Sequence, residues 1–147
     1  LRRQSTPLIA YFDTSAVIPL LVEEPGSELA ANLWSQADRI LSARILYPEG
    51  RAALAAARRS GRLSTGQLRR TVGELSNLVE QLDHVEITEH LAYSAGELAE
   101  KHSLRGYDAV HLAAAELAAD EDLVLVAGDG ELLRAAATIG LNTARIG

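Results

Sequence analysis

The chain has 147 residues, a formal net charge of −6 and 48% hydrophobic residues, a composition typical of a globular domain with its own core. It has no cysteine, which excludes disulfides and thiolate metal sites. No apolar run reaches the roughly 18 residues that span a bilayer, and no secretory segment stands near the start, so we expect a cytoplasmic protein without membrane contact. The chain also lacks methionine, so we expect that Leu1 is not the start of translation. The acidic balance argues against nucleic-acid binding by bulk charge, although divalent cations can neutralise phosphates locally.

Hydrophobic patterning predicts an alternation of strands and helices along one domain, residues 1–147. Apolar runs predict strands at 8–12, 40–43, 85–87, 123–127 and 142–146. Helices are expected from residue 14, over 27–37, from about residue 48 to Gly61, over 64–82, 88–102 and 106–119, and after residue 129. This alternation predicts an α/β fold with a parallel sheet covered on both faces.

Local signals fix several helix ends. Ser64 and Gln67 form a predicted capping box, and Thr88 is a predicted cap of the next helix. Ser27 is expected to cap the helix 27–37, which should bury Leu29, Leu33 and Trp34. Pro48 is tolerated only in a first helical turn, so the regular helix is expected to begin near it.

Asp13 directly follows the first buried strand. An ionised carboxylate beside a core must be solvated, paired or bound to a metal. Asp13 therefore has two interpretations: it caps the helix from Thr14, or it lies in a ligand site at the carboxyl end of the sheet.

Three further acids stand in apolar surroundings. Glu49 lies on an alanine-rich helix face, Asp108 interrupts the most apolar helix, and Asp129 follows the strand 123–127. Oxygen ligands of this kind suit Mg²⁺ or Mn²⁺, and two such ions can drive phosphodiester cleavage. The alternative is four unrelated acids, two of them helix caps and two of them solvated.

Four strings, YFDTSA, PEGRAALAAARR, LRGYDAVHLAAA and VAGDGELLRAA, resemble PIN-domain ribonucleases in their order and spacing, above all the VapC-type toxins of bacterial type II toxin–antitoxin systems. The resemblance covers nearly the whole chain. It implies a PIN-like fold with a five-stranded parallel sheet, a homodimer, a cognate VapB-type antitoxin and an RNA substrate. It also implies Mg²⁺- or Mn²⁺-dependent endoribonuclease activity. The metal-binding and catalytic acids it implies are Asp13, Glu49, Asp108 and Asp129, supported by Thr14 or Ser15.

The chain departs from the family pattern near its last acid. The family often has Thr or Ser two places before that acid, where this chain has Ala127, and Gly128 and Gly130 flank Asp129. These differences leave the role of Asp129 less defined than the roles of the other three acids.

Two further features have open interpretations. His111 shares a helix face with Asp108 and is expected to donate to a neighbouring carboxylate or carbonyl rather than bind a metal itself. Arg44, Arg51, Arg58 and Arg62 would share one face of a continuous helix, as either a solvated surface or an RNA track.

Other functions fit the sequence less well. A catalytically inactive PIN-like module that binds RNA or protein remains an alternative, although the intact set of acids argues against it. A phosphatase with an aspartate nucleophile would have a second acid where Ser15 stands. A dinucleotide-binding domain would have a G-x-G-x-x-G motif after the first strand, and none is present.

Overall fold

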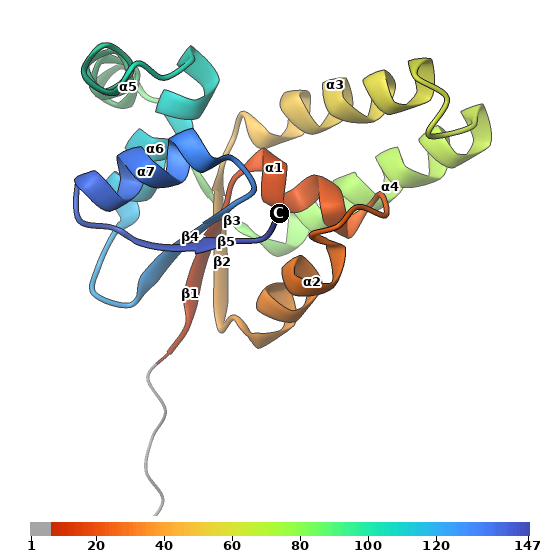
Figure 1. The fold of residues 1–147 in the computed structure, drawn as a ribbon, viewed down its shortest axis with the longest axis horizontal. Helices are drawn as coiled ribbons and strands as arrows, with labels where there is room; N and C mark the ends of the chain where they lie inside the picture. The colour runs from red at the N-terminus through yellow and green to blue at the C-terminus, as the bar shows by residue number, and fades with distance from the viewer. Residues whose placement is uncertain (1–6) are drawn as a thin grey trace, which may run out of the picture.

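A five-stranded parallel sheet forms the centre of the protein, in a computed structural model that describes residues 7–147 (Figure 1). Its order is β3-β2-β1-β4-β5. The strands are β1 (Ile9–Phe12), β2 (Arg39–Ala43), β3 (Asp83–Val85), β4 (Leu123–Ala127) and β5 (Asn142–Arg145). The predicted α/β fold with a parallel sheet is confirmed.

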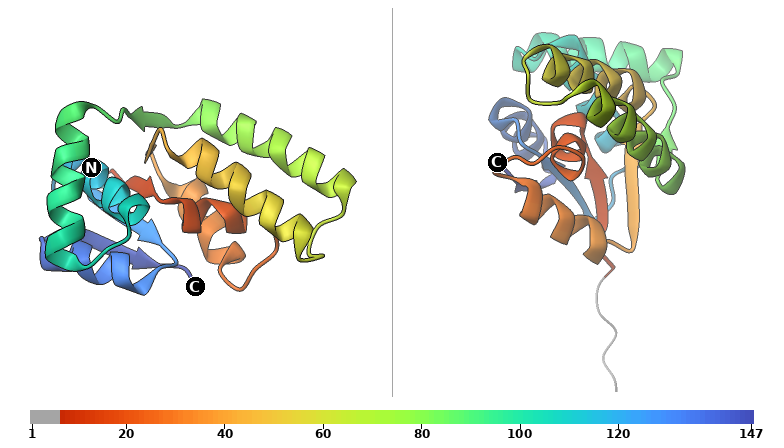
Figure 2. Two further views of the ribbon diagram at one scale, coloured as in Figure 1. Left: turned by 90° about the horizontal axis from the view of Figure 1, so that it is seen from above. Right: turned by 90° about the vertical axis from the view of Figure 1, so that its right-hand side faces the viewer.

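Helices cover both faces of this sheet (Figures 1 and 2). The helices are α1 (Thr14–Val17) with the 3-10 turn η1 (Ile18–Leu20), α2 (Ser27–Gln36), α3 (Leu46–Arg59), α4 (Thr65–Gln81), α5 (Glu89–His102), α6 (Gly106–Ala118) and α7 (Gly130–Thr138). Helices α5, α6 and α7 pack on one face, and α1 to α4 pack on the other. In the part of the chain that the structure describes, no helix is both long and apolar enough to cross a bilayer.

The central strands are apolar throughout because both faces are buried. In β1, Ala10 and Phe12 face the core under α1–α4, whereas Tyr11 faces the core under α5–α7. The neighbouring β4 divides in the same way, with Leu125 and Val126 on opposite faces.

The chain order creates a switch point between β1 and β4. From β1 the chain builds β2 and β3 on one side, then returns to place β4 on the other side of β1. Phe12 pairs with Val126, and the Asp13 N–H donates to the Val126 carbonyl at 3.2 Å. Ligands of open α/β sheets bind at such a point, beyond the carboxyl ends of the strands.

Helices α3 and α4 form a hairpin, and the two helices lie side by side in both views of Figure 2. The predicted capping box at Ser64 and Gln67 is present and begins α4. Gly50 lets the two helices approach closely, since a Cβ added there would lie 2.9 Å from Leu75 Cδ2.

Some predicted details are wrong. Ser27 is the first residue of α2 rather than its cap. Its hydroxyl accepts a hydrogen bond from the Glu24 N–H and donates one to the Val22 carbonyl, both in the preceding turn. Leu29 is 45% exposed, and Ala30 is the residue of α2 that is buried. The third strand begins two residues earlier than predicted, at Asp83, because this edge strand lacks the apolar run of the central strands.

Candidate active site

A cleft of about 580 Å³ opens beyond the carboxyl ends of β1 and β4, between α3 and α6. All four acids singled out in the sequence line it: Asp13, Glu49, Asp108 and Asp129. Thr14, Ser15 and His111 line it as well. The fold thus brings together residues that are as far apart as 13 and 129 in the sequence.

Asp13 is both the cap of α1 and part of the cleft, so its two interpretations are compatible. Its Oδ1 accepts hydrogen bonds from the Ser15 hydroxyl at 2.7 Å and the Ala16 N–H at 3.1 Å. The residue is only 2% exposed. Burial raises the pKa of Asp13 to about 6, the negative charge of Asp108 adds to the increase, and His111 and the two hydrogen bonds oppose it.

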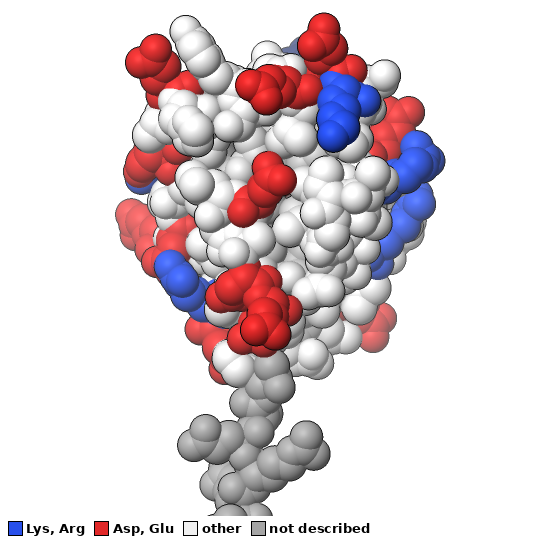
Figure 3. Space-filling view, turned by 90° about the vertical axis from the view of Figure 1, so that its left-hand side faces the viewer, with Lys and Arg blue, Asp and Glu red and all other residues white. Residues whose placement is uncertain are grey.

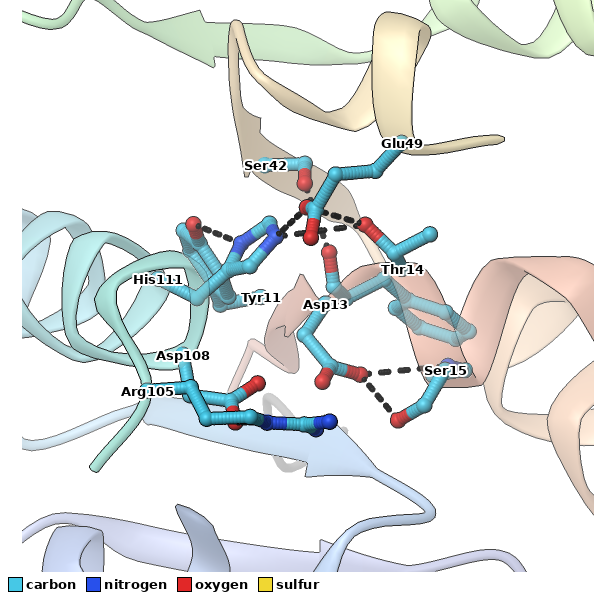
Figure 4. Close-up of polar contacts among 11 residues, drawn as sticks. Tyr11, Asp13, Thr14, Ser15, Ser42, Glu49, Arg105, Asp108 and His111 are labelled. Carbon is cyan, nitrogen blue, oxygen red and sulfur yellow. Dashed lines mark hydrogen bonds and ion pairs between the residues drawn. The ribbon is translucent and has the colours of Figure 1, made fainter. Parts of the chain in front are cut away.

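Glu49 is held by a hydrogen-bonded chain that crosses from α3 to the sheet (Figure 4). Its Oε1 accepts the Thr14 hydroxyl at 2.7 Å and lies 2.7 Å from His111 Nε2. His111 Nδ1 lies 2.8 Å from the Tyr11 hydroxyl. With the proton on Nε2, the ring donates to Glu49 and accepts from Tyr11, so every member is satisfied. The structure thus places His111 within hydrogen-bond distance of a carboxylate, where the sequence predicted that it would donate.

This network also sets the charge of its members. Burial raises the pKa of Glu49, but the hydrogen bonds from His111 and from the Thr14 hydroxyl oppose that increase, and the net shift is downward. Burial raises the pKa of Tyr11, and the nearby charge of Asp13 raises it further. Glu49 is thus stabilised as a carboxylate and Tyr11 as a neutral phenol.

Arg105 is the positive charge of the cleft. Its Nε lies 3.1 Å from Asp108 Oδ2, and its terminal nitrogen lies 3.5 Å from Asp129 Oδ2. Burial raises the pKa of Asp108, and the Arg105 guanidinium opposes that increase. The Arg105 side chain is 79% exposed, so these ion pairs are weak and easily exchanged.

Asp129 caps α7, with its Oδ1 accepting the N–H groups of Glu131 at 2.9 Å and Leu132 at 3.4 Å. The hydroxyl near this turn is that of Ser15 on α1, which bonds the backbone next to Asp129 and not Asp129 itself. Ser15 Oγ accepts the Gly128 N–H at 2.8 Å while donating to Asp13. One serine therefore connects the ends of β1 and β4.

The donor set has the chemistry of a site for a hard cation, because it consists of carboxylate oxygens at a buried edge of the sheet. Only Oδ1 of Asp13 accepts hydrogen bonds from the described residues, which leaves its Oδ2 for another ligand. Within residues 7–147, no three Asp, Glu or His side chains already converge as a metal-binding group. The reason is local: Arg105 holds Asp108 and Asp129, while Thr14 and His111 hold one oxygen of Glu49.

The prediction that four arginines share one face of a continuous helix is wrong. Arg44 precedes α3 and pairs with Glu86, and Arg62 follows α3 and pairs with Glu24. Only Arg51 and Arg58 lie on the helix, and Arg51 is turned away from Glu49 because residues two apart project about 200° from each other.

Sequence reasoning missed three residues of the cleft and its surroundings. Tyr11 looks like an ordinary core residue of a buried strand. Arg105 and Tyr107 look like ordinary surface residues at the start of a helix. The available signal for Arg105 was its spacing of three from Asp108, which places both on one side of α6.

Comparison with known proteins gives consistent results. A family model described as the PIN domain matches residues 10–137. Ribonuclease VapC45 of Mycobacterium tuberculosis (strain CDC 1551 / Oshkosh) is 43% identical over 138 residues, which cover 94% of this chain and 95% of that protein.

Solved structures share the fold at lower identity. VapC20 of Mycobacterium tuberculosis, described as a sarcin-ricin loop cleaving toxin, superposes with a TM-score of 0.70 at 16% identity, covering 92% of this chain and 98% of that chain. A chain of a toxin–antitoxin complex from Klebsiella pneumoniae superposes with a TM-score of 0.57 at 23% identity, covering 82% of this chain and 86% of that chain.

Proposed function

The chain belongs to the PIN-domain family, and from this premise we propose that it is an endoribonuclease that hydrolyses RNA phosphodiester bonds in the cleft between α3 and α6. The observation that carries the proposal is that Asp13, Glu49, Asp108 and Asp129 all line one cleft at the switch point of the sheet. The VapC45 relative, similar over 94% of this chain, is named a ribonuclease.

PIN ribonucleases generally use a divalent metal. For this chain we propose Mg²⁺ or Mn²⁺, held by Asp13, Glu49, Asp108 and Asp129. When bound, such an ion activates water and stabilises the charge on the leaving oxygen. Oxygen-only ligands favour these ions over softer metals.

The chain's own residues prepare the cleft for this chemistry. Thr14 and His111 orient Glu49 and keep it ionised. Ser15 fixes one oxygen of Asp13. Arg105 balances Asp108 and Asp129, and its exposed guanidinium is free to contact a phosphate of bound RNA instead.

Charge elsewhere on the molecule is consistent with RNA entering at the cleft. Figure 3 shows the left-hand side of Figure 1, where acidic side chains are widespread and basic ones few. A polyanion is repelled from that face. By contrast, the stretch 50–73, which contains most of α3 and the start of α4, has six arginines and no acid.

A cell that makes such an enzyme must restrain it, and we propose a VapB-type protein antitoxin as partner. The Klebsiella pneumoniae relative was solved as a toxin–antitoxin complex. A groove of about 350 Å³ lies between η1, α2 and α4, and its lining includes Leu20, Leu21, Trp34 and Leu78. An amphipathic helix of the antitoxin would place its apolar face in this groove. A homodimer and a cytoplasmic location complete the proposal.

The enzymatic part is tested with purified protein and a mixed RNA substrate. Cleavage is expected with Mg²⁺ or Mn²⁺ and not with chelator. Asp108→Asn should be inactive with an unchanged circular dichroism spectrum, while Glu97→Gln, an exposed acid on α5, should retain activity. RNA binding without cleavage would favour the inactive binding module, and full activity in chelator would exclude the proposed chemistry.

The partner is tested by expression in cells. The chain alone should arrest growth, and co-expression with the gene immediately upstream should restore it. Ala31→Arg, which places a charge in the apolar groove, should abolish the rescue, whereas Ala92→Arg on α5 should not. Absence of toxicity from the active enzyme would count against an antitoxin.

A further inference from the structure

Tyr107 is a large aromatic residue without a structural role. It is 62% exposed, yet its side chain lines the cleft. Among the described residues, it makes no side-chain hydrogen bond and no aromatic pair. An exposed aromatic ring at the rim of a polar site is a common means of binding a flat ligand.

The opposite wall of the cleft leaves room for such a ligand. The contact of His111 with Glu49 joins α6 to α3. Tyr107 lies one helical turn before His111, and Ala52 and Ala53 lie one turn after Glu49. All three residues line the same cleft. The Tyr107 ring and the small side chains of Ala52 and Ala53 therefore enclose one part of that cleft.

The groups around this space are suited to an RNA base. Ala52, Ala53 and nearby Pro48 are apolar and carry no side-chain hydrogen-bonding group. Arg105, two residues before Tyr107, places an exposed guanidinium beside the acids, where the phosphate of the same nucleotide would lie. Stacking on an aromatic side chain holds any base, because every base has a flat π-face.

We propose that Tyr107 is a positioning residue, on which an RNA base next to the cleaved phosphate stacks, with Ala52 and Ala53 covering the other face of the base. The inference rests on the proposed ribonuclease function and adds a base-binding subsite to it. It follows that this subsite selects for stacking area, so purines bind it more tightly than pyrimidines, and that it does not read base edges.

Binding is measured first, by fluorescence anisotropy of a labelled RNA oligonucleotide, in an Asp108→Asn background that cannot cut it. Adding Tyr107→Ala should weaken binding about 5- to 150-fold, and adding Tyr107→Phe should weaken it less than about twofold. Ala52→Leu, which fills the space, should weaken binding like Tyr107→Ala. Tyr93→Ala is the matched control, since Tyr93 is a 70% exposed tyrosine on α5 outside the cleft.

Cleavage then identifies the stacked nucleotide. RNAs with one abasic residue at each position around the cut site are compared in wild type and Tyr107→Ala. At one position, removal of the base should raise KM in wild type and have no further effect in Tyr107→Ala, because the two changes remove the same contact.

The outcomes separate the two proposals. If wild type neither binds nor cuts RNA, the ribonuclease function and the stacking subsite both fail. If wild type cuts RNA but Tyr107→Ala behaves like Tyr93→Ala, the stacking subsite alone is wrong. If Tyr107→Ala loosens the antitoxin complex and leaves RNA binding unchanged, the space belongs to the protein partner and the inference is overturned.

Discussion

His111 Nε2 lies 2.7 Å from Glu49 Oε1, while its Nδ1 lies 2.8 Å from the Tyr11 hydroxyl. A single buried imidazole thus connects a carboxylate on α3 to the central strand of the sheet. Because both ring nitrogens are used, the ring has one orientation, and Glu49 has one position relative to Asp13.

We expect His111→Ala to lower the free energy of unfolding by about 2–4 kcal/mol, because it leaves a cavity and removes the hydrogen bonds of the ring to the buried Tyr11 hydroxyl and to Glu49. RNA cleavage should fall as well, since Glu49 loses its orientation. Urea denaturation and cleavage rates measure the two effects. His90→Ala, at an exposed position of α5, should change stability by less than about 0.5 kcal/mol.

The pKa of Asp13, raised to about 6, predicts how stability depends on pH in the metal-free protein. The folded state binds a proton more tightly than the unfolded state, so stability falls as the pH rises from about 4 through 6. Glu49 has a lowered pKa, and its contribution is lost only in more acidic solution. Asp13→Asn removes the buried charge while its Oδ1 can still accept from Ser15 and Ala16.

In chelator at pH 7.5, Asp13→Asn should therefore be more stable than wild type by about 0.5–2 kcal/mol, and the difference should shrink at pH 5. With saturating Mg²⁺ the order should reverse, because the folded wild type binds the ion. Melting temperatures of wild type and Asp13→Asn, measured over this pH range with chelator and with Mg²⁺, test this prediction. A variant that melts below wild type in chelator would show that the Asp13 carboxylate stabilises the metal-free folded state, and would contradict the predicted cost of its burial.

Arg105→Gln should affect metal and RNA in opposite directions. Removing the cation frees Asp108 and Asp129, so Mn²⁺ should bind about 2- to 5-fold more tightly, in line with the small energy of an exposed ion pair. RNA should bind more weakly, because a phosphate contact is lost. Calorimetry and anisotropy measure the two constants. Arg134→Gln, at an exposed position of α7, should change neither, and equal effects of both variants would indicate general charge alone.

Substituting alanine for either of two glycines in the α3–α4 hairpin should change the stability of the protein in opposite directions. Gly50→Ala places a Cβ 2.9 Å from the fully buried Leu75 and should destabilise the protein by about 1–3 kcal/mol, displacing α3 and lowering cleavage through Glu49. Gly73→Ala on α4 meets no atom within 4 Å and should stabilise the protein by about 0.5–1 kcal/mol. Stabilisation by both changes would show that α3 can shift without strain.

The sequence predicts the parts of this molecule where burial constrains residue type. Strands β1 and β4 are apolar on both faces, so their positions and the acids that follow them could be inferred. Strand β3 lies at the sheet edge with little apolar pattern, and its start was misplaced by two residues. Arg105 and Tyr107 are exposed, and exposed positions accept these residues for many reasons. Only the cleft around them shows their relation to the acids.

The topology also determines when the site can exist. Asp13 is near the start of the chain, but the cleft is not complete until β4 pairs with β1 and places Asp129 beside it. A ribosome releases the N-terminal part first, so Asp13, Glu49 and Asp108 emerge while β1 still has one open edge. Under the proposed function, the growing chain therefore completes its cleavage site only after β4 has been made, and its own synthesis delays its activity.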